Sequence, residues 1–170
     1  MAEATMIKRL SSPEFQGLVQ EVLDRGVRFR FRARGRSMYP FILSGDTLLV
    51  EAVDPARVSP GDVVLFCQPD NNPIVHRVVE RMANGGQVIL ITRGDNLVHE
   101  DQPIKGEWVL GRVVEVERQG RCLRLDRGPG RLLNRSACYL QGWSPWRFTA
   151  VRKLGRLPWR CLARLLWRRA

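Results

Sequence analysis

Three polar segments interrupt the apolar stretches of this 170-residue sequence, and each carries a group used in nucleophilic catalysis. Ser37 follows a glycine in a turn-like segment, His76 interrupts an apolar run, and Asp95 and Asp101 share one polar segment. A hydroxyl, a base that titrates near neutral pH and a carboxylate that orients it are the parts of nucleophilic acyl transfer. Each residue alone also has a structural explanation, because serine and aspartate are common in turns. The combination indicates acyl transfer, but these residues alone leave the structural explanation open.

The composition argues against a metal site or a disulfide scaffold. His76 and His99 are the only histidines, and neither has a short metal-type spacing from any of the four cysteines. Four cysteines in a chain of this length are also too few for a small disulfide-rich secreted domain. We therefore expect no metal and no cofactor.

The net charge of +11 comes from the end of the chain. Up to Asp126 the sequence carries 17 acidic and 17 basic residues, and every charged residue from Arg127 to Arg169 is basic. The high pI therefore describes a tail, and nucleic acid is not an expected partner of the protein as a whole.

The first element expected is a short amphipathic helix within residues 1–26. Ser12-Pro13-Glu14 is typical of a helix start, and Gly26 of a helix end. Between them, one apolar stripe is formed by Phe15, Leu18, Val19, Val22 and Leu23.

A mostly antiparallel β-fold, a sandwich or barrel, is expected for residues 27–126. Val27 to Arg34 alternates strictly between apolar residues and arginines, which predicts a half-buried strand. Asn84-Gly85-Gly86 and Gln119-Gly120 predict hairpin turns. The other predicted strands are Thr47–Val53, Asp62–Cys67, Ile74–Arg81, Gln87–Thr92, Trp108–Glu117 and Arg121–Leu125.

Residues 127–170 form a basic tail rich in tryptophan and arginine. Its expected helix starts near Pro158 and carries Arg156, Arg160, Arg164 and Arg168 on one face, opposite Trp and Leu side chains. Such a helix could lie in an anionic membrane surface, or pack its apolar face on the β-domain. No stretch reaches the 18 to 20 or so apolar residues of a bilayer span, and no signal peptide is seen. The expected location is the cytoplasm, with a peripheral position on the inner face of the membrane as an option.

Taken in order, the polar motifs resemble the signal peptidase I family of serine peptidases. The self-cleaving repressor peptidases share that β-rich fold, of the S24 and S26 types. The resemblance covers Val27 to Glu117 and rests on these motifs: Gly35-Arg36-Ser37-Met38-Tyr39-Pro40, Ser44-Gly45-Asp46, Gly61-Asp62-Val63-Val64, His76-Arg77-Val78-Val79, Gly94-Asp95-Asn96 and Gly111-Arg112-Val113-Val114.

The resemblance implies Ser37 as nucleophile and His76 as base. Bacterial-type signal peptidases use a lysine where this chain has His76, so the chain is similar to the archaeal and endoplasmic-reticulum branch with Ser, His and Asp. The spacing within that branch makes Asp101 the third member, with Asp95 supporting the site.

The implied function is a serine endopeptidase that removes a leader or signal segment from a precursor. Some relatives have a serine oxyanion donor where this chain has Gly35, so backbone N–H groups around Ser37 must serve. Gly35, Arg36, Met38 and Pro40 are the expected oxyanion and substrate-binding residues. The alternative is a catalytically silent peptidase-fold protein that binds membrane or nucleic acid through its arginine strand and tail.

Overall fold

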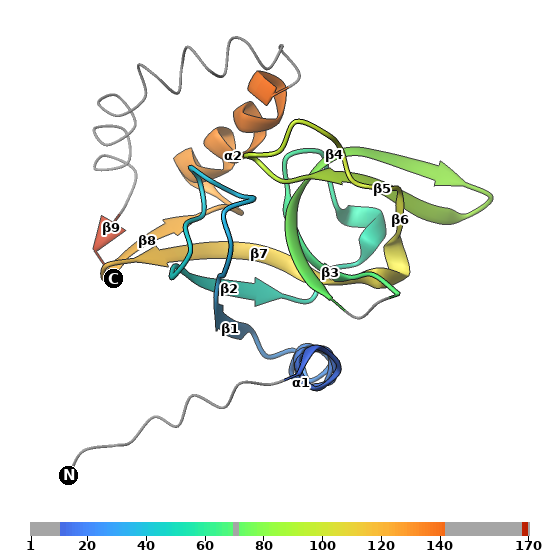
Figure 1. Ribbon diagram of the computed structural model, residues 1–170, viewed down its shortest axis with the longest axis horizontal. Helices are drawn as coiled ribbons and strands as arrows, with labels where there is room; N and C mark the ends of the chain where they lie inside the picture. The colour runs from blue at the N-terminus through green and yellow to red at the C-terminus, as the bar shows by residue number, and fades with distance from the viewer. Residues whose placement is uncertain (1–10, 70–71, 142–167, 170) are drawn as a thin grey trace.

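The computed structural model describes residues 11–69, 72–141 and 168–169. The strands of this structure form one curled antiparallel sheet (Figure 1). The expected mostly β fold with a short N-terminal helix is confirmed. The elements are α1 (Ser12–Asp24), β1 (Phe29–Arg32), β2 (Thr47–Glu51), η1 (Pro55–Arg57), β3 (Val63–Cys67), β4 (Pro73–Asn84), β5 (Gln87–Arg93), β6 (Ile104–Lys105), η2 (Gly106–Trp108), β7 (Val109–Arg118), β8 (Arg121–Arg124), α2 (Gly128–Gln141) and β9 (Arg168–Arg169).

Strand β7 organises the sheet because both of its edges are paired. One edge pairs with β2, with Leu48 opposite Val116. The other edge is shared by β3, with Leu65 opposite Gly111, and by β8 nearer the end of β7. From β3 the sheet continues through β4 and β5 to β6 and curls as it does so (Figure 1). The antiparallel pairing of β4 and β5 sets Arg77 opposite Arg93, so His76 lies near the polar loop that follows β5.

Two apolar clusters form the core on the two parts of this curled sheet. The first packs Val19 and Leu23 of α1 against side chains of β2 and β7. The second lies within the β3–β6 part and includes Phe66, Val78 and Leu90. The alternation predicted for the arginine strand is confirmed, since the phenylalanines of β1 pack on the first cluster while its arginines are exposed.

Local signals placed most element ends within a few residues. Helix α1 is capped by Ser11, one residue before the expected serine, and the Glu14 carboxylate accepts a hydrogen bond from the Ser11 N–H at 2.9 Å. Both predicted hairpin turns are present between β4 and β5 and between β7 and β8. Gly85 and Gly86 adopt the positive φ angles that such tight turns require.

Two features of the C-terminal region differ from the sequence analysis. The residues of α2 were expected to belong to the basic tail, but they form a helix that packs against β8 and β4. Arg168 was expected on a helical face, but it lies in β9, opposite Cys122 of β8. A strand residue at this position cannot share a helix face with the preceding arginines. Arg156, Arg160 and Arg164 lie outside the described residues.

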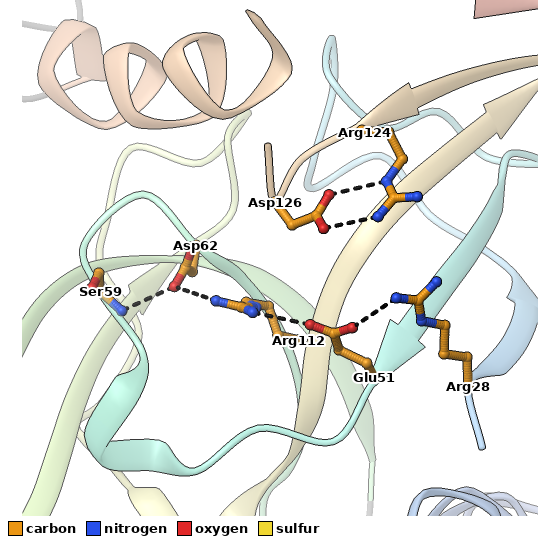
Figure 2. A network of polar contacts seen from close by, with 7 residues as sticks. All are labelled: Arg28, Glu51, Ser59, Asp62, Arg112, Arg124 and Asp126. Carbon is orange, nitrogen blue, oxygen red and sulfur yellow. Dashed lines mark hydrogen bonds and ion pairs between the residues drawn. The ribbon is translucent and has the colours of Figure 1, made fainter. Parts of the chain in front are cut away.

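Charged side chains on β2 and β7 are arranged as a connected network (Figure 2). The Glu51 carboxylate accepts hydrogen bonds from Arg28 at 3.3 Å and from Arg112 at 3.0 Å. Arg112 also lies 3.7 Å from Asp62. Glu51, Arg112 and Asp62 therefore partly neutralise one another across the sheet.

Further ion pairs neutralise neighbouring arginines. Arg30 of β1 pairs with Glu117 of β7, and Arg124 of β8 pairs with Asp126 at 2.8 Å (Figure 2). These pairs are partly exposed and contribute little stability each. They do leave the arginine strand with less free positive charge than its sequence suggests. Among the described residues, no helix has both the length and the apolar character of a membrane span.

Candidate active site

The polar segments of the sequence meet where the turn after β1, strand β4 and the loop after β5 come together. The backbone N–H of Asn96, in the loop after β5, donates to the carbonyl of Ser37 at 2.6 Å. The N–H of Asp101 donates to the Thr92 carbonyl at 2.8 Å and ties the end of that loop to β5. Main-chain hydrogen bonds therefore fix the serine segment and the carboxylate segment relative to the same strand.

His76 and Asp101 form a partly buried hydrogen-bonded pair. Imidazole Nδ1 lies 2.6 Å from Asp101 Oδ2, and the two side chains are 8% and 17% exposed. The Thr92 hydroxyl donates to the same carboxylate oxygen at 2.7 Å. Because an ionised carboxylate only accepts, this pairing assigns the proton to Nδ1 in a neutral imidazole. Nε2 then carries the lone pair that a general base needs.

The surroundings of Asp101 favour its ionised form. Burial on its own would raise the pKa of this carboxyl, but the hydrogen bonds from His76 and Thr92, with the attraction to His76, outweigh burial and lower the pKa below its ordinary value. The carboxylate therefore stays charged throughout the pH range in which histidine side chains titrate.

This lowered pKa links Asp101 to stability at acid pH. A carboxyl whose pKa is lower in the folded chain stabilises the fold above its unfolded pKa, and this contribution is lost as pH falls through the folded pKa. We expect Asp101→Asn to be less stable than the wild type near neutral pH, with a difference that shrinks below about pH 4. Urea unfolding of both proteins at a series of pH values measures it. A difference that stays constant down to acid pH would contradict the pairing.

Gly94 lies between the His76 imidazole and the Ser37 backbone, in a space too small for a side chain. A Cβ atom at this position would lie 3.0 Å from His76 Nε2 and 2.8 Å from the Ser37 carbonyl oxygen. Nε2 of His76, the imidazole nitrogen that does not contact Asp101, thus lies close to Gly94. The Ser37 backbone carbonyl packs on the same glycine. The structure thus brings the Ser37 segment, His76 and Asp101 to one place.

The turn that carries Ser37 is held by its own hydrogen bonds. The N–H of Tyr39 donates to the Arg36 carbonyl at 3.2 Å, and that of Ile42 donates to the Met38 carbonyl at 3.0 Å. Ser37 is half-buried between these bonds. Local hydrogen bonding therefore fixes the serine backbone without a regular element.

The predicted substrate-binding residues of this turn differ in exposure. Gly35 and Arg36 are exposed, and Gly35 has a φ of +92°, a left-handed conformation that favours glycine. Pro40 is half-buried and follows a cis peptide bond. The Met38 side chain is 4% exposed and packs in the core, so a contact with substrate would have to involve mainly its backbone. The roles of all four residues stay predictions.

The far end of the same turn is anchored to β7. Asp46, 4% exposed, receives two hydrogen bonds from Arg118, at 2.8 Å and 2.6 Å. Asp46 also accepts from the Leu43 N–H at 2.7 Å. The Ser-Gly-Asp motif thus holds the serine turn on the sheet.

Asp95 has a different partner from Asp101. Its carboxylate receives hydrogen bonds from Nε and Nη2 of Arg77, at 2.8 Å and 2.7 Å, and both side chains are buried. Arg77 directly follows His76 in β4. Asp95 therefore lies against Arg77, and Asp101 against the imidazole.

Sequence reasoning did not single out Arg77, Thr92 or Asn134 as residues of the site. The signal for Arg77 was present, since a charged residue follows His76 inside an apolar strand. Thr92 could have been found from its place at the end of β5, where the loop to Asp101 begins. No sequence signal pointed to Asn134. Within the part of the chain that the structure describes, no cluster of three or more metal-ligating side chains occurs.

Comparison with known proteins gives one family and two relatives. The family described as Peptidase S24-like matches residues 17–114, more than half of the chain. Signal peptidase I W of Bacillus subtilis is 35% identical over 75 residues, which cover 43% of this chain and 40% of the relative. The signal peptidase complex catalytic subunit SEC11 of Fusarium vanettenii is 38% identical over 80 residues, or 45% and 46% of the two chains. The chain spans less than half the length of these relatives.

Proposed function

Because the chain belongs to the Peptidase S24-like family, we propose that it is a serine endopeptidase of signal peptidase I type that removes a leader or signal segment from a precursor. The resemblance drawn from the ordered motifs is confirmed by the family match and by the two signal peptidase relatives. The relatives' names support precursor proteins as the substrate class.

The His76–Asp101 pair beside the Ser37 turn carries this proposal. A histidine with one nitrogen bonded to a carboxylate and the other close to the glycine on which a serine backbone packs can activate a hydroxyl. A histidine that only fills space in the core would not need a partly buried carboxylate with a lowered pKa beside it.

The proposed reaction proceeds in two steps. Nε2 of His76 takes the Ser37 proton while Oγ attacks the scissile carbonyl, and the amine leaves with that proton. Water then attacks the acyl-enzyme and gives a proton to Nε2, which passes it to Ser37 Oγ as the ester bond breaks and the carboxylic acid leaves. Asp101 stabilises the imidazolium formed in each step. Backbone N–H groups around Ser37 supply the oxyanion donors, since Gly35 offers no side chain.

The substrate is proposed to lie extended beside the serine turn. Two apolar side chains next to this turn are exposed, Tyr39 at 43% and Leu97 at 44%. Leu97 also lies against Gly94, where its Cδ1 would be 3.0 Å from an added Cβ. We propose that Tyr39 and Leu97 contact the small apolar residues before the cleavage site.

The binding-protein alternative is not favoured. Arg28 and Arg30 of the arginine strand are paired with Glu51 and Glu117, so they offer little free charge to phosphates. The proposal of an anionic membrane surface as a partner of the tail, and with it a peripheral position on the inner face of the membrane, remains a prediction. Residues 142–167 of that tail lie outside the described residues.

The test is to trap the acyl-enzyme. The full chain is incubated with N-acetylalanine p-nitrophenyl ester, from which serine Oγ would displace nitrophenolate and form an ester bond. We expect a burst of nitrophenolate and a mass increase of one acetylalanyl group on the peptide that contains Ser37. The heat-unfolded chain is the control and should not react. A label spread over lysines, or on a serine other than Ser37, would contradict the proposal.

A further inference from the structure

We propose that Asn134 of helix α2 is a positioning residue for the active site, so that a helix outside the family match is part of the catalytic unit. This inference rests on the proposed function. Asn134 lies beyond residue 114, where the match to the family ends. It is nevertheless 3% exposed and points at Arg77, the neighbour of His76. Helix α2 packs against β4, the strand that carries Arg77 and His76.

The guanidinium of Arg77 is shared between the site and α2. Nε and Nη2 bind the Asp95 carboxylate, as described above. Nη1 donates to the Gly61 carbonyl at 2.9 Å, to the Asn134 carbonyl at 3.2 Å, and to the Asn134 side-chain oxygen. The Phe41 ring lies 5.2 Å from the guanidinium carbon. One edge of the guanidinium therefore binds the loop after β5, and the other edge binds α2 and the turn before β3.

Asp95 transmits this arrangement to the reacting residues. It lies between Gly94, which packs on His76 Nε2 and on the Ser37 carbonyl, and Asn96, whose N–H binds that carbonyl. A shift of the Arg77 guanidinium would move Asp95, and the loop would carry the shift to the nucleophile and the base. Displacements of about 1 Å at such a site can cost a hundredfold in rate.

Close packing between α2 and the turn before β3 supports this role independently of the hydrogen bonds. Gly61 has a φ of +97°, and a Cβ at this position would lie 3.0 Å from Cα of Arg135 and 3.3 Å from the Asn134 carbonyl oxygen. Only glycine allows the helix to approach so closely. The Gly61 motif thus seats α2 against Arg77.

The chemistry of the asparagine suits this position. A buried guanidinium needs an acceptor for each N–H that leaves water. Asp95 accepts from Nε and Nη2 of Arg77, and the Asn134 side-chain oxygen accepts from Nη1. The structure therefore assigns Asn134 the task of supplying an acceptor oxygen to the buried guanidinium.

Two variants of nearly the same size separate positioning from mere packing. Asn134→Leu removes the acceptor, whereas Asn134→Asp keeps an oxygen at the same place. In cleavage of a precursor peptide by the full chain, we expect Asn134→Leu to lower kcat about tenfold with KM within about twofold. Asn134→Asp should recover most of kcat. Leu132→Ala is the control on the same helix, because Leu132 is 73% exposed.

The result that overturns the inference is a folded Asn134→Leu protein with the wild-type kcat, whatever its loss of thermal stability. Equal losses in the Leu and Asp variants would overturn it as well, since the oxygen would then not matter. If Ser37→Ala is inactive while Asn134→Leu keeps full kcat, the inference fails and the proposed function stands.

A spectroscopic measurement decides the inference even if no peptide is cleaved and the proposed function fails. The Nδ1 proton that His76 shares with Asp101 and the Asn96 amide proton both report on the site by NMR. We expect both signals to shift in Asn134→Leu and to return in Asn134→Asp. Signals unchanged in Asn134→Leu would overturn the positioning role.

Discussion

Replacing Ser37 or His76 by alanine is expected to lower kcat for precursor cleavage by about three to six orders of magnitude, with the fold retained. The serine supplies the bond-forming oxygen and the histidine its proton acceptor, so neither works without the other. The double variant should therefore be no slower than either single one. Steady-state cleavage of a precursor peptide measures the rates, and circular dichroism checks the fold.

Matched control variants are available for both residues. Ser59 and His99 are exposed and lie outside the serine turn and the His76–Asp101 pair. Ser59→Ala and His99→Ala should cleave at the wild-type rate. Cleavage by a folded Ser37→Ala or His76→Ala protein within tenfold of the wild type would disprove the assignment of that residue.

Gly94→Ala is expected to lower kcat about a hundredfold. The added methyl group would lie 2.8 Å from the Ser37 carbonyl oxygen and 3.0 Å from His76 Nε2, so one of them must move. The first of these atoms is backbone and the second belongs to an imidazole held by Asp101, so neither yields easily. The expected effect is a wider gap between nucleophile and base. Peptide cleavage gives the rate, and the Nδ1 proton signal of His76 reports the displacement.

Gly17→Ala is the control for this change. Gly17 lies in α1 with no atom within 4 Å of an added Cβ. Alanine there should leave kcat unchanged and raise the free energy of unfolding by up to about 1 kcal/mol, because glycine is a poor helix former. If Gly94→Ala kept the wild-type kcat, the close approach of Ser37 and His76 around this glycine would be wrong.

The strands and α1 could be predicted because their patterns are local. The phenylalanines and arginines of β1 alternate with a period of two, and Ser-Pro-Glu marks the start of α1. The sequence analysis does not predict α2, because it assigns residues 127–170 to one basic tail with a helix only near Pro158. Pro129 is nevertheless compatible with a first helical turn. What fixes α2 is its packing on β8 and β4, and no local pattern encodes those contacts.

The residues of the site could be proposed by type and order, and the family resemblance ranked Asp101 above Asp95, but no pattern pointed to the contact between Asp95 and Arg77. Asp95 and Asp101 are six residues apart, and only the course of the loop decides that Asp101 meets the imidazole while Asp95 meets Arg77. In β4, His76, Arg77 and Val78 are all buried, although their alternating orientation would send Arg77 to the opposite face. Coverage of that face by α2 removes the usual contrast between an inner and an outer side.

We expect the buried pair of Arg77 and Asp95 to make the proposed active site sensitive to heat. Truncating either partner would leave a buried charge unmatched, which typically costs about 3–5 kcal/mol. Small proteins have only about 5–15 kcal/mol in total. A collection of random inactive variants should therefore fall into two groups. Substitutions at Ser37 and His76 would be inactive at every temperature, whereas those at Arg77 and Asp95 would behave as temperature-sensitive alleles that recover function in the cold.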